Sequence, residues 1–305
     1  MKILVTGGAG FIGSHVGEVY RKAGHGVVVV DDLSSGKRKN LPSGVRLVKA
    51  DVQDLALSRL FKKERFDVVC HHAAQMDVRR SVADPSLDAR VNVLGFINIL
   101  EQCRVFGVKK VIFAASGGTY YGETARPARE DVLPCPLSPY GVTKLTGEYY
   151  LRAYRALHGL SYTVLRYGNV FGPRQDPHGE AGVVAIFCRR LLAGETVTIY
   201  GDGKQKRDYV YVGDVARANL AALERGTDKS INIGTGRATS VNELFRVLST
   251  IRKGKAQKVY APARAGELFQ SVLNPGLAQR ELGWKAEVSL KEGLERTYRF
   301  IEGKI

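Results

Sequence analysis

The stretch that decides the fold is Thr6-Gly7-Gly8-Ala9-Gly10-Phe11-Ile12-Gly13, directly after the apolar run Lys2-Ile3-Leu4-Val5. Its glycines Gly7, Gly10 and Gly13 are three residues apart. Such glycines let the turn tighten, let the backbone approach a pyrophosphate, and let the following helix pack closely on the strand. The helix then offers free N–H groups and the positive end of its dipole to an anion. The stretch predicts a strand–loop–helix unit that binds a dinucleotide.

An acidic residue stands where the next strand ends. Asp31 follows a run of four valines and lies 18 residues past Gly13, well placed to accept hydrogen bonds from the adenosine ribose. Its carboxylate would repel a 2′-phosphate, so the sequence favours NAD over NADP. Lys37 and Arg38, a few residues later, leave NADP open.

Strands and helices alternate through the first half of the chain. The expected strands are residues 2–5, 27–30, 45–48, 67–70, 110–114 and 163–165. The expected helical segments are residues 7–24 (with the turn), 55–65, 84–106 and 138–157. Nearly continuous apolar strands separated by helices imply a parallel sheet covered on both faces. We therefore expect an α/β fold with a Rossmann-type, doubly wound parallel sheet.

The alternation of strands and helices ends after Asn169. Further on, the sequence predicts helices over residues 182–193 and 290–302, with short pieces rich in Gly, Thr and Tyr between them. We expect an NAD-binding domain over residues 1–168 and a smaller, irregular α/β domain, mainly for substrate, over 169–305. Residues 208–225 are expected to return to the first domain.

Composition excludes several classes of protein. With 305 residues, 44% hydrophobic and 25% charged, the chain has enough apolar material for a sizeable core. No apolar run approaches the roughly 18 residues of a membrane span. We expect no signal peptide ahead of the first strand, and four widely separated cysteines suit a reducing cytoplasm. The net charge of +16 favours anionic partners, but the basic residues are scattered, which is typical of solvated faces rather than of a nucleic-acid site.

A tyrosine and a lysine lie at the start of the helix expected after Ser138-Pro139. Serine suits the N-cap and proline the first helical position. Tyr140 and Lys144 are four residues apart and share one helical face. Tyrosine, with a pKa near 10, is a poor base, but a nearby ammonium and a nicotinamide cation would favour its phenolate. Alone the pair is commonly a surface feature; behind a dinucleotide loop it indicates proton removal from a sugar hydroxyl.

Two other candidates have structural alternatives. Asp51 follows the third expected strand, where an acid either contacts adenine or caps a helix. Cys70-His71-His72 resembles a metal ligand set, but adjacent side chains on a strand face opposite ways. We expect packing beside the cofactor there, and no metal.

Across essentially its whole length the chain resembles the extended short-chain dehydrogenases/reductases of the NAD-dependent epimerase/dehydratase family, and within it those that epimerise UDP-glucose at C4. Besides the glycine loop and the Tyr140–Lys144 pair, the resemblance rests on residues 31–36, 72–75, Asn92, 116–118, 121–122, 166–169, 200–203, 207–209 and 264–267.

The resemblance implies a site residue by residue. Implied NAD contacts are Gly7, Gly10, Phe11, Ile12, Gly13, Asp31, Asp32, Ser34, Ser35, Gly36, Asp51, Val52, Ala73, Ala74, Gln75, Asn92, Tyr140, Lys144 and Tyr167. Implied substrate contacts are Asn169, Arg207, Arg264, Glu267 and Ser271. The two arginines would grip a diphosphate, with surface ion pairs as their alternative. The small Ser271 would leave room for N-acetylated hexosamines.

One position departs from the family. Gly117 stands where a serine or threonine usually hydrogen-bonds the reacting oxygen. Ser116 is the nearest hydroxyl, with Thr119 or a water as alternatives. Gly117-Gly118 also lacks the Asp-Glu pair of a 4,6-dehydratase, which favours 4-epimerisation of a UDP-hexose with NAD bound throughout.

Other activities and the assembly stay open. Another nucleotide-sugar epimerase or a decarboxylase fits the same scaffold, and a non-enzymatic NAD-sensing or nucleic-acid-binding protein has only the charge in its favour. The resemblance further implies a homodimer formed through the helices expected over 84–106 and 138–157.

Overall fold

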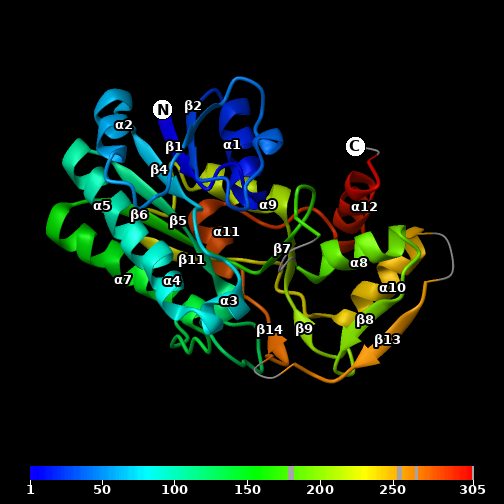
Figure 1. The fold of residues 1–305 in the computed structure, drawn as a ribbon. Coiled ribbons are helices and arrows are strands. Elements are labelled where there is room, and N and C mark those ends of the chain that lie inside the picture. The colour runs from blue at the N-terminus through cyan, green and yellow to red at the C-terminus, as the bar shows by residue number, and fades with distance from the viewer. Residues whose placement is uncertain (178–181, 253–255, 265–266, 304–305) are drawn as a thin grey trace.

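A seven-stranded parallel sheet forms the centre of the computed structural model, which describes residues 1–177, 182–252, 256–264 and 267–303 (Figure 1). Its strand order is β11-β6-β5-β4-β1-β2-β3. The strands are β1 (Lys2–Thr6), β2 (Gly26–Asp31), β3 (Arg46–Lys49), β4 (Val68–His71), β5 (Lys110–Ser116), β6 (Ser161–Tyr167) and β11 (Lys229–Ile233). The order reverses between β1 and β4, the switch point at which such sheets bind ligands. The predicted Rossmann-type sheet is confirmed.

Strand β11 is the member of this sheet that the sequence pattern does not predict. It comes after the alternation of strands and helices has ended, and only Ile231 and Ile233 mark it as apolar. It pairs in parallel with β6, and both isoleucines are fully buried. Part of the second half of the chain thus completes the first sheet.

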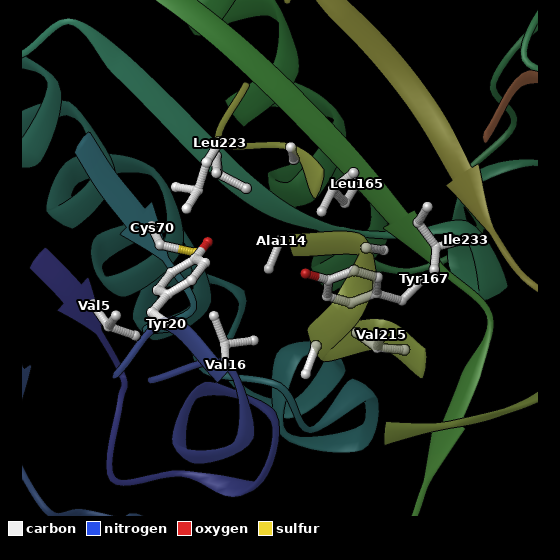
Figure 2. Packing of buried hydrophobic residues seen from close by; sticks show 14 of the residues in the cluster. Val5, Val16, Tyr20, Cys70, Ala114, Leu165, Tyr167, Val215, Leu223 and Ile233 are labelled. Carbon is white, nitrogen blue, oxygen red and sulfur yellow. The ribbon is translucent and has the colours of Figure 1, made fainter. Parts of the chain in front are cut away.

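Helices cover both faces of the sheet. One face carries α1 (Phe11–Lys22), α9 (Val212–Ala221) and α11 (Gly276–Leu282). The other carries α2 (Leu57–Glu64), α5 (Gly95–Phe106) and α7 (Pro139–His158). Figure 2 shows the first interface, where Tyr20 of α1 lies against Cys70 of β4 and Tyr167 of β6 lies near Val215 of α9.

The long helix expected over residues 84–106 is interrupted. After α3 (Val78–Ala83), the chain forms α4 (Pro85–Ala89), a π-helical turn (Arg90–Leu94) and then α5. Asp84 accepts a hydrogen bond from Leu87 N at 2.8 Å and so caps α4. Apolar periodicity does not distinguish a π turn from an α turn, so the sequence gives no sign of it. The turn rotates Asn92 into the protein, where it is buried.

A smaller layer lies at one end of the sheet (Figure 1). Helices α8 (Val183–Leu192), α10 (Val241–Arg252) and α12 (Leu290–Ile301) share a core with β8 (Val197–Tyr200), which pairs with β13 (Lys258–Ala261). Two small sheets connect the layers: β7 (Asn169–Phe171) with β10 (Tyr209–Tyr211), and β9 (Lys206–Arg207) between β12 (Thr239–Ser240) and β14 (Gln270–Ser271).

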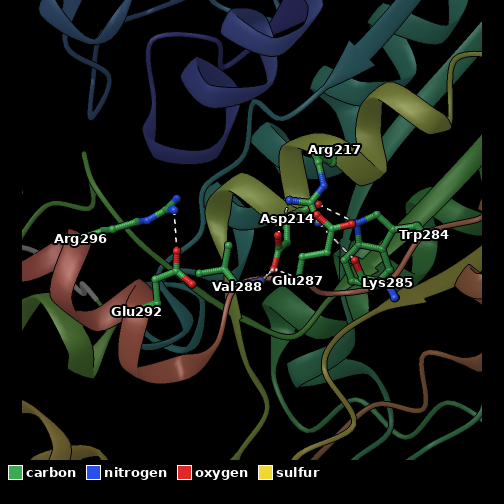
Figure 3. A network of polar contacts seen from close by, with 8 residues as sticks. All are labelled: Asp214, Arg217, Trp284, Lys285, Glu287, Val288, Glu292 and Arg296. Atoms are coloured by element: carbon green, nitrogen blue, oxygen red, sulfur yellow. Dashed lines mark hydrogen bonds and ion pairs between the residues drawn. The ribbon is translucent and has the colours of Figure 1, made fainter.

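A buried carboxylate fixes α9 to the segment leading into α12 (Figure 3). Asp214 Oδ2 accepts the backbone N–H of Glu287 and of Val288, each at 3.1 Å, and Oδ1 lies 2.5 Å from the Arg217 guanidinium. Trp284 Nε1 donates to the Asp214 carbonyl at 2.8 Å. Within the described ranges, no helix is long and apolar enough to cross a membrane.

Candidate active site

The glycine loop leaves no room for side chains at Gly7 and Gly13. Gly7 has a φ of +66°, and a Cβ there would lie 2.6 Å from Ala73 N. A Cβ on Gly13 would collide with the Gly7 carbonyl. Helix α1 begins at Phe11 with Gly10 as N-cap, and no side chain of the described chain caps it. Its first N–H groups, those of Phe11 and its successors Ile12 and Gly13, therefore remain available to an anion, as an NAD pyrophosphate requires.

Asp31 lies at the carboxyl end of β2, beside this loop. Its side chain accepts hydrogen bonds from Ala9 N at 2.9 Å and Leu33 N at 2.8 Å. Burial raises its pKa, and the backbone donors partly oppose that shift. Each carboxylate oxygen keeps further lone pairs for ribose hydroxyls. A Cβ on Gly36 would lie 2.6 Å from Asp31 Oδ1, so only glycine leaves the carboxylate accessible there.

The rest of this loop is held by a local turn and by one distant ion pair. Asp32 accepts hydrogen bonds from the backbone and hydroxyl of Ser34, at 2.9 and 2.7 Å, and Ser35 follows. Lys37 Nζ lies 3.1 Å from Asp176 Oδ2. This ion pair partly neutralises the lysine charge that would be needed to bind the 2′-phosphate of NADP. Arg38 begins a short 3₁₀ helix (Arg38–Asn40).

Asp51 and Val52 shape the loop after β3. Asp51 Oδ1 accepts from Gln53 N at 2.8 Å, so this acid stabilises a local turn. Val52 is buried, and its carbonyl accepts from Asn98 Nδ2 at 2.7 Å. The helix cap foreseen as the alternative for Asp51 is absent, since the N-cap of α2 is Ala56, and adenine contact by the exposed Asp51 carboxylate stays a prediction.

The segment Ala73-Ala74-Gln75 crosses the carboxyl edge of the sheet and is clamped by Asn92. Gln75 N donates to Asn92 Oδ1 at 2.8 Å, and Asn92 Nδ2 donates to the Gln75 carbonyl at 2.9 Å. Ala73 N lies 3.3 Å from Thr6 Oγ1. Asn92 is only 3% exposed and holds this segment in place, and its own contact with NAD stays a prediction.

Helix α7 presents the tyrosine and lysine as the sequence predicts. Ser138 Oγ accepts from Gly141 N at 3.1 Å, and Pro139 is the first helical residue. Lys144 Nζ donates to the Ala114 carbonyl at 3.1 Å and lies 5.8 Å from the centre of the Tyr140 ring. The pair therefore meets the end of β5 at the same edge as the glycine loop.

Burial dominates the electrostatics of this pair. It raises the pKa of Tyr140 to about 12, with the Asp88 charge adding to the shift and a hydrogen bond from Ser116 opposing it. Burial also lowers the pKa of Lys144 to about 8, while Asp88 opposes that shift. The lysine ammonium by itself thus does not produce a phenolate at neutral pH, and the expected activation needs the second positive charge, that of the nicotinamide.

The residues after β5 explain the missing family hydroxyl. Gly117 begins α6 (Gly117–Tyr120), and a Cβ there would lie 2.6 Å from Leu273 Cδ1 and 3.2 Å from the Tyr167 carbonyl. The leucine fills the space that a serine side chain would need. The Ser116 hydroxyl lies beside Tyr140 and lowers the pKa of its phenol, whereas Thr119 Oγ1 is buried without a partner among the described residues.

Tyr167 directs its side chain into the core rather than toward the predicted site (Figure 2). Its hydroxyl lies 3.2 Å from His72 Nε2 and accepts from Asn219 Nδ2 at 2.9 Å. Burial lowers the pKa of His72 to about 3 and that of His71 well below its usual value, so both imidazoles are neutral. Any cofactor contact of Tyr167 is left to its backbone.

The short strands bring three predicted substrate residues beside α6. Ser271 of β14 lies in register with Arg207 of β9, and Ser271 Oγ is 3.4 Å from the Gly118 carbonyl. Asn169 Oδ1 is buried without a hydrogen-bond partner in the described chain, 3.6 Å from where a Gly118 Cβ would lie. An unsatisfied buried polar atom calls for an explanation, and the predicted substrate contact of Asn169 would supply one.

The two predicted phosphate-binding arginines already have neighbours. Arg207 NH2 lies 3.3 Å from Glu267 Oε1, the ion pair that the sequence left as its alternative. The Arg264 guanidinium lies 3.9 Å above the centre of the Tyr200 ring. A diphosphate would have to compete with Glu267 for Arg207.

Sequence reasoning missed three residues that build this site. Asp88 and Thr143 form a buried polar cluster with Asn92, and Asp208 is fully buried next to Arg207. Asp208 accepts the N–H groups of Thr235, Gly236 and Leu273 at 2.8, 3.1 and 3.2 Å. Nothing local in the sequence shows that these polar residues are buried.

The NAD dependent epimerase/dehydratase family model matches residues 3–234. The chain belongs to this family. A UDP-glucose 4-epimerase of Mycolicibacterium smegmatis is 45% identical to this family member, over 100% of this chain and 99% of its own. The crystal structure of Thermotoga maritima UDP-glucose 4-epimerase with UDP-glucose superposes with a TM-score of 0.98 at 49% identity, covering 99% of both chains. That of Thermus thermophilus UDP-glucose 4-epimerase in complex with NAD has a TM-score of 0.95 at 44% identity and covers 100% of both. The epimerase/dehydratase-family protein described here is accordingly an NAD-dependent enzyme.

Proposed function

We propose that this protein is a UDP-hexose 4-epimerase that interconverts UDP-glucose and UDP-galactose through a 4-keto sugar. The observation that carries the proposal is the juxtaposition of Tyr140, Lys144 and Ser116 at the sheet edge that also holds the glycine loop. Full-length similarity to UDP-glucose 4-epimerases supports the choice of reaction and substrate.

The chemistry is divided between the cofactor and the side chains. When bound, NAD would take hydride from C4 of the sugar and return it to the opposite face. Tyr140 removes the proton of the 4-hydroxyl and later gives it back. Ser116 hydrogen-bonds the reacting oxygen in place of the hydroxyl that Gly117 lacks. Lys144 holds the nicotinamide ribose and keeps positive charge beside the phenol.

The second half of the chain would hold the nucleotide. Arg207 and Arg264 bind the diphosphate, and Asn169 contacts it from β7, so residues 169–305 serve mainly the substrate. The small Ser271 leaves space near the sugar 2-substituent, so N-acetylated hexosamines are accepted too. Ser271→Tyr should lose the N-acetylated substrate first, and an unchanged ratio of the two rates would remove the basis for this role.

A homodimer is proposed through the outer faces of α5 and α7. Exposed apolar side chains gather on these helices and the adjoining π turn: Leu94, Val105, Val142, Tyr149 and Leu157. Water contact with such a surface is unfavourable, and a second copy would cover it. Leu157→Lys combined with Tyr149→Lys should yield a monomer in analytical ultracentrifugation, and an unchanged sedimentation coefficient would argue against this interface.

Four free thiols support a cytoplasmic location.

The substrate is tested by incubating the purified protein, without added NAD, with UDP-galactose, UDP-GalNAc or UDP-glucuronate and following products by NMR. The proposal expects UDP-glucose from UDP-galactose. A 4-keto-6-deoxy product would instead indicate a dehydratase. Turnover of UDP-glucuronate alone would keep 4-epimerisation but change the sugar.

A further inference from the structure

A fully buried carboxylate connects the two halves of the active site. Asp88 lies in the last turn of α4, and its side chain has no solvent exposure. Gln75 Nε2 donates to its Oδ1 at 2.9 Å, and Asn92 Nδ2 donates to the same oxygen at 3.0 Å. Its Oδ2 accepts from Thr143 Oγ1 at 2.7 Å. All three neighbours donate, so both carboxylate oxygens of Asp88 act as acceptors.

These three partners come from three different elements. Gln75 belongs to the segment beside the glycine loop, Asn92 to the π-helical turn, and Thr143 to α7 between Tyr140 and Lys144. One-turn π-helical insertions are frequent at functional sites, and here the turn brings Asn92 onto Asp88. Movement of α7 relative to the cofactor segment would therefore break hydrogen bonds to Asp88.

The Asp88 charge also acts on the reacting pair. It raises the pKa of both Tyr140 and Lys144, opposing the effect of burial on the lysine and adding to it on the tyrosine. The other groups facing the pair are His71 of β4, His72 directly after it, both of which burial keeps neutral, and the hydroxyl of Ser116. Among the residues that the structure describes, Asp88 is therefore the negative charge that faces this pair.

We propose that Asp88 is a positioning residue that joins α7 to the cofactor segment and sets the pH range in which Tyr140 and Lys144 work. The proposal assumes the proton transfer described above for Tyr140. Without the carboxylate the phenol ionises more easily and the ammonium loses its proton more easily. Both limits of the active pH range then move to lower pH.

Asp88→Asn tests this with little change of shape. The retained amide oxygen accepts from Gln75 and Asn92. The new amide nitrogen donates to Thr143 Oγ1, whose hydroxyl turns to the Tyr140 carbonyl 3.0 Å away. The kcat–pH profile of UDP-galactose conversion should shift down on both limbs by about one pH unit, the low end of the ~1–3 units typical of a close buried charge. Thr143→Val, which removes a hydrogen bond and no charge, is the matched control and should keep the wild-type limits even if its rate falls.

A second readout does not depend on turnover. In NMR titrations of isotope-labelled lysine, with the Lys144 signal assigned by Lys144→Arg, the Lys144 pKa should lie lower in Asp88→Asn than in wild type. The Lys144 pKa can be measured in a folded protein that has no activity. Failure of this inference can therefore be told apart from failure of the proposed reaction. Asp88→Ser, which removes the same charge and admits water, replaces Asp88→Asn if that variant does not fold. Unshifted profiles and titrations in a folded neutral variant, or failure of both variants to fold, would reduce Asp88 to a structural role and overturn the proposal.

Discussion

Substitution of Gly117 by alanine should destabilise the protein, although alanine normally favours a helix. The added Cβ would lie 2.6 and 2.9 Å from the two methyl carbons of Leu273, a side chain 1% exposed and packed with Tyr120 and Tyr121. Overpacking of this kind costs about 1–3 kcal/mol. At neighbouring Gly118 a Cβ meets only Asn169 Oδ1, at an ordinary 3.6 Å. Gly118→Ala should therefore be neutral, or stabilising by up to about 1 kcal/mol from reduced chain entropy.

The assay is a double-mutant cycle read by urea unfolding with two spectroscopic probes. Leu273→Ala alone should cost about 2–5 kcal/mol, because it opens a cavity. In Gly117→Ala/Leu273→Ala the overlap is gone, so the double variant should be less destabilised than the sum of the singles by about 1–2 kcal/mol. Additive costs, or equal effects of alanine at Gly117 and Gly118, would refute the claim that Leu273 excludes a side chain at Gly117.

Three further predictions concern the site itself. Ser116→Ala should lower kcat roughly tenfold to a hundredfold, since a hydrogen bond involving a charged group is worth about 1.5–3 kcal/mol; a wild-type rate would point to Thr119 or water. Arg207→Ala should raise KM for the UDP-sugar roughly tenfold or more on the same grounds, with a smaller ratio at high salt; a salt-independent ratio would argue against a phosphate contact. Lys144→Met should stabilise the fold by about 3 kcal/mol at neutral pH, because lowering a pKa from 10.5 to about 8 disfavours the protonated lysine in the folded state. That difference is fully present below about pH 8 and fades as pH rises to 10.5, so a pH-independent difference in urea midpoints would contradict it.

The parts of the site that sequence alone predicts are those written in local patterns. The glycine spacing before α1, the acid ending β2, and Ser138-Pro139 ahead of Tyr140 each fix a turn, a strand end or a helix start within a few residues. Their chemistry follows from backbone geometry and helix caps, which short stretches determine.

The parts that sequence does not predict depend on distant partners. Asp88 meets Thr143 across 55 positions, and Gly117 meets Leu273 of a loop near the C-terminus. Strand β6 is buried on both of its faces, so its apolar pattern does not show to which face the Tyr167 side chain points. Such contacts arise only when the sheet has assembled.

The central claim is that Tyr140 removes a proton while the hydrogen on C4 leaves and returns within the site. The most direct measurement is conversion of UDP-galactose deuterated at C4 by wild type and by Tyr140→Phe, followed by NMR. The account predicts UDP-glucose that retains deuterium at C4 with wild type, and a rate lower by about 10²–10⁴ with the folded variant. Loss of the label to solvent, or undiminished conversion by Tyr140→Phe, would contradict it.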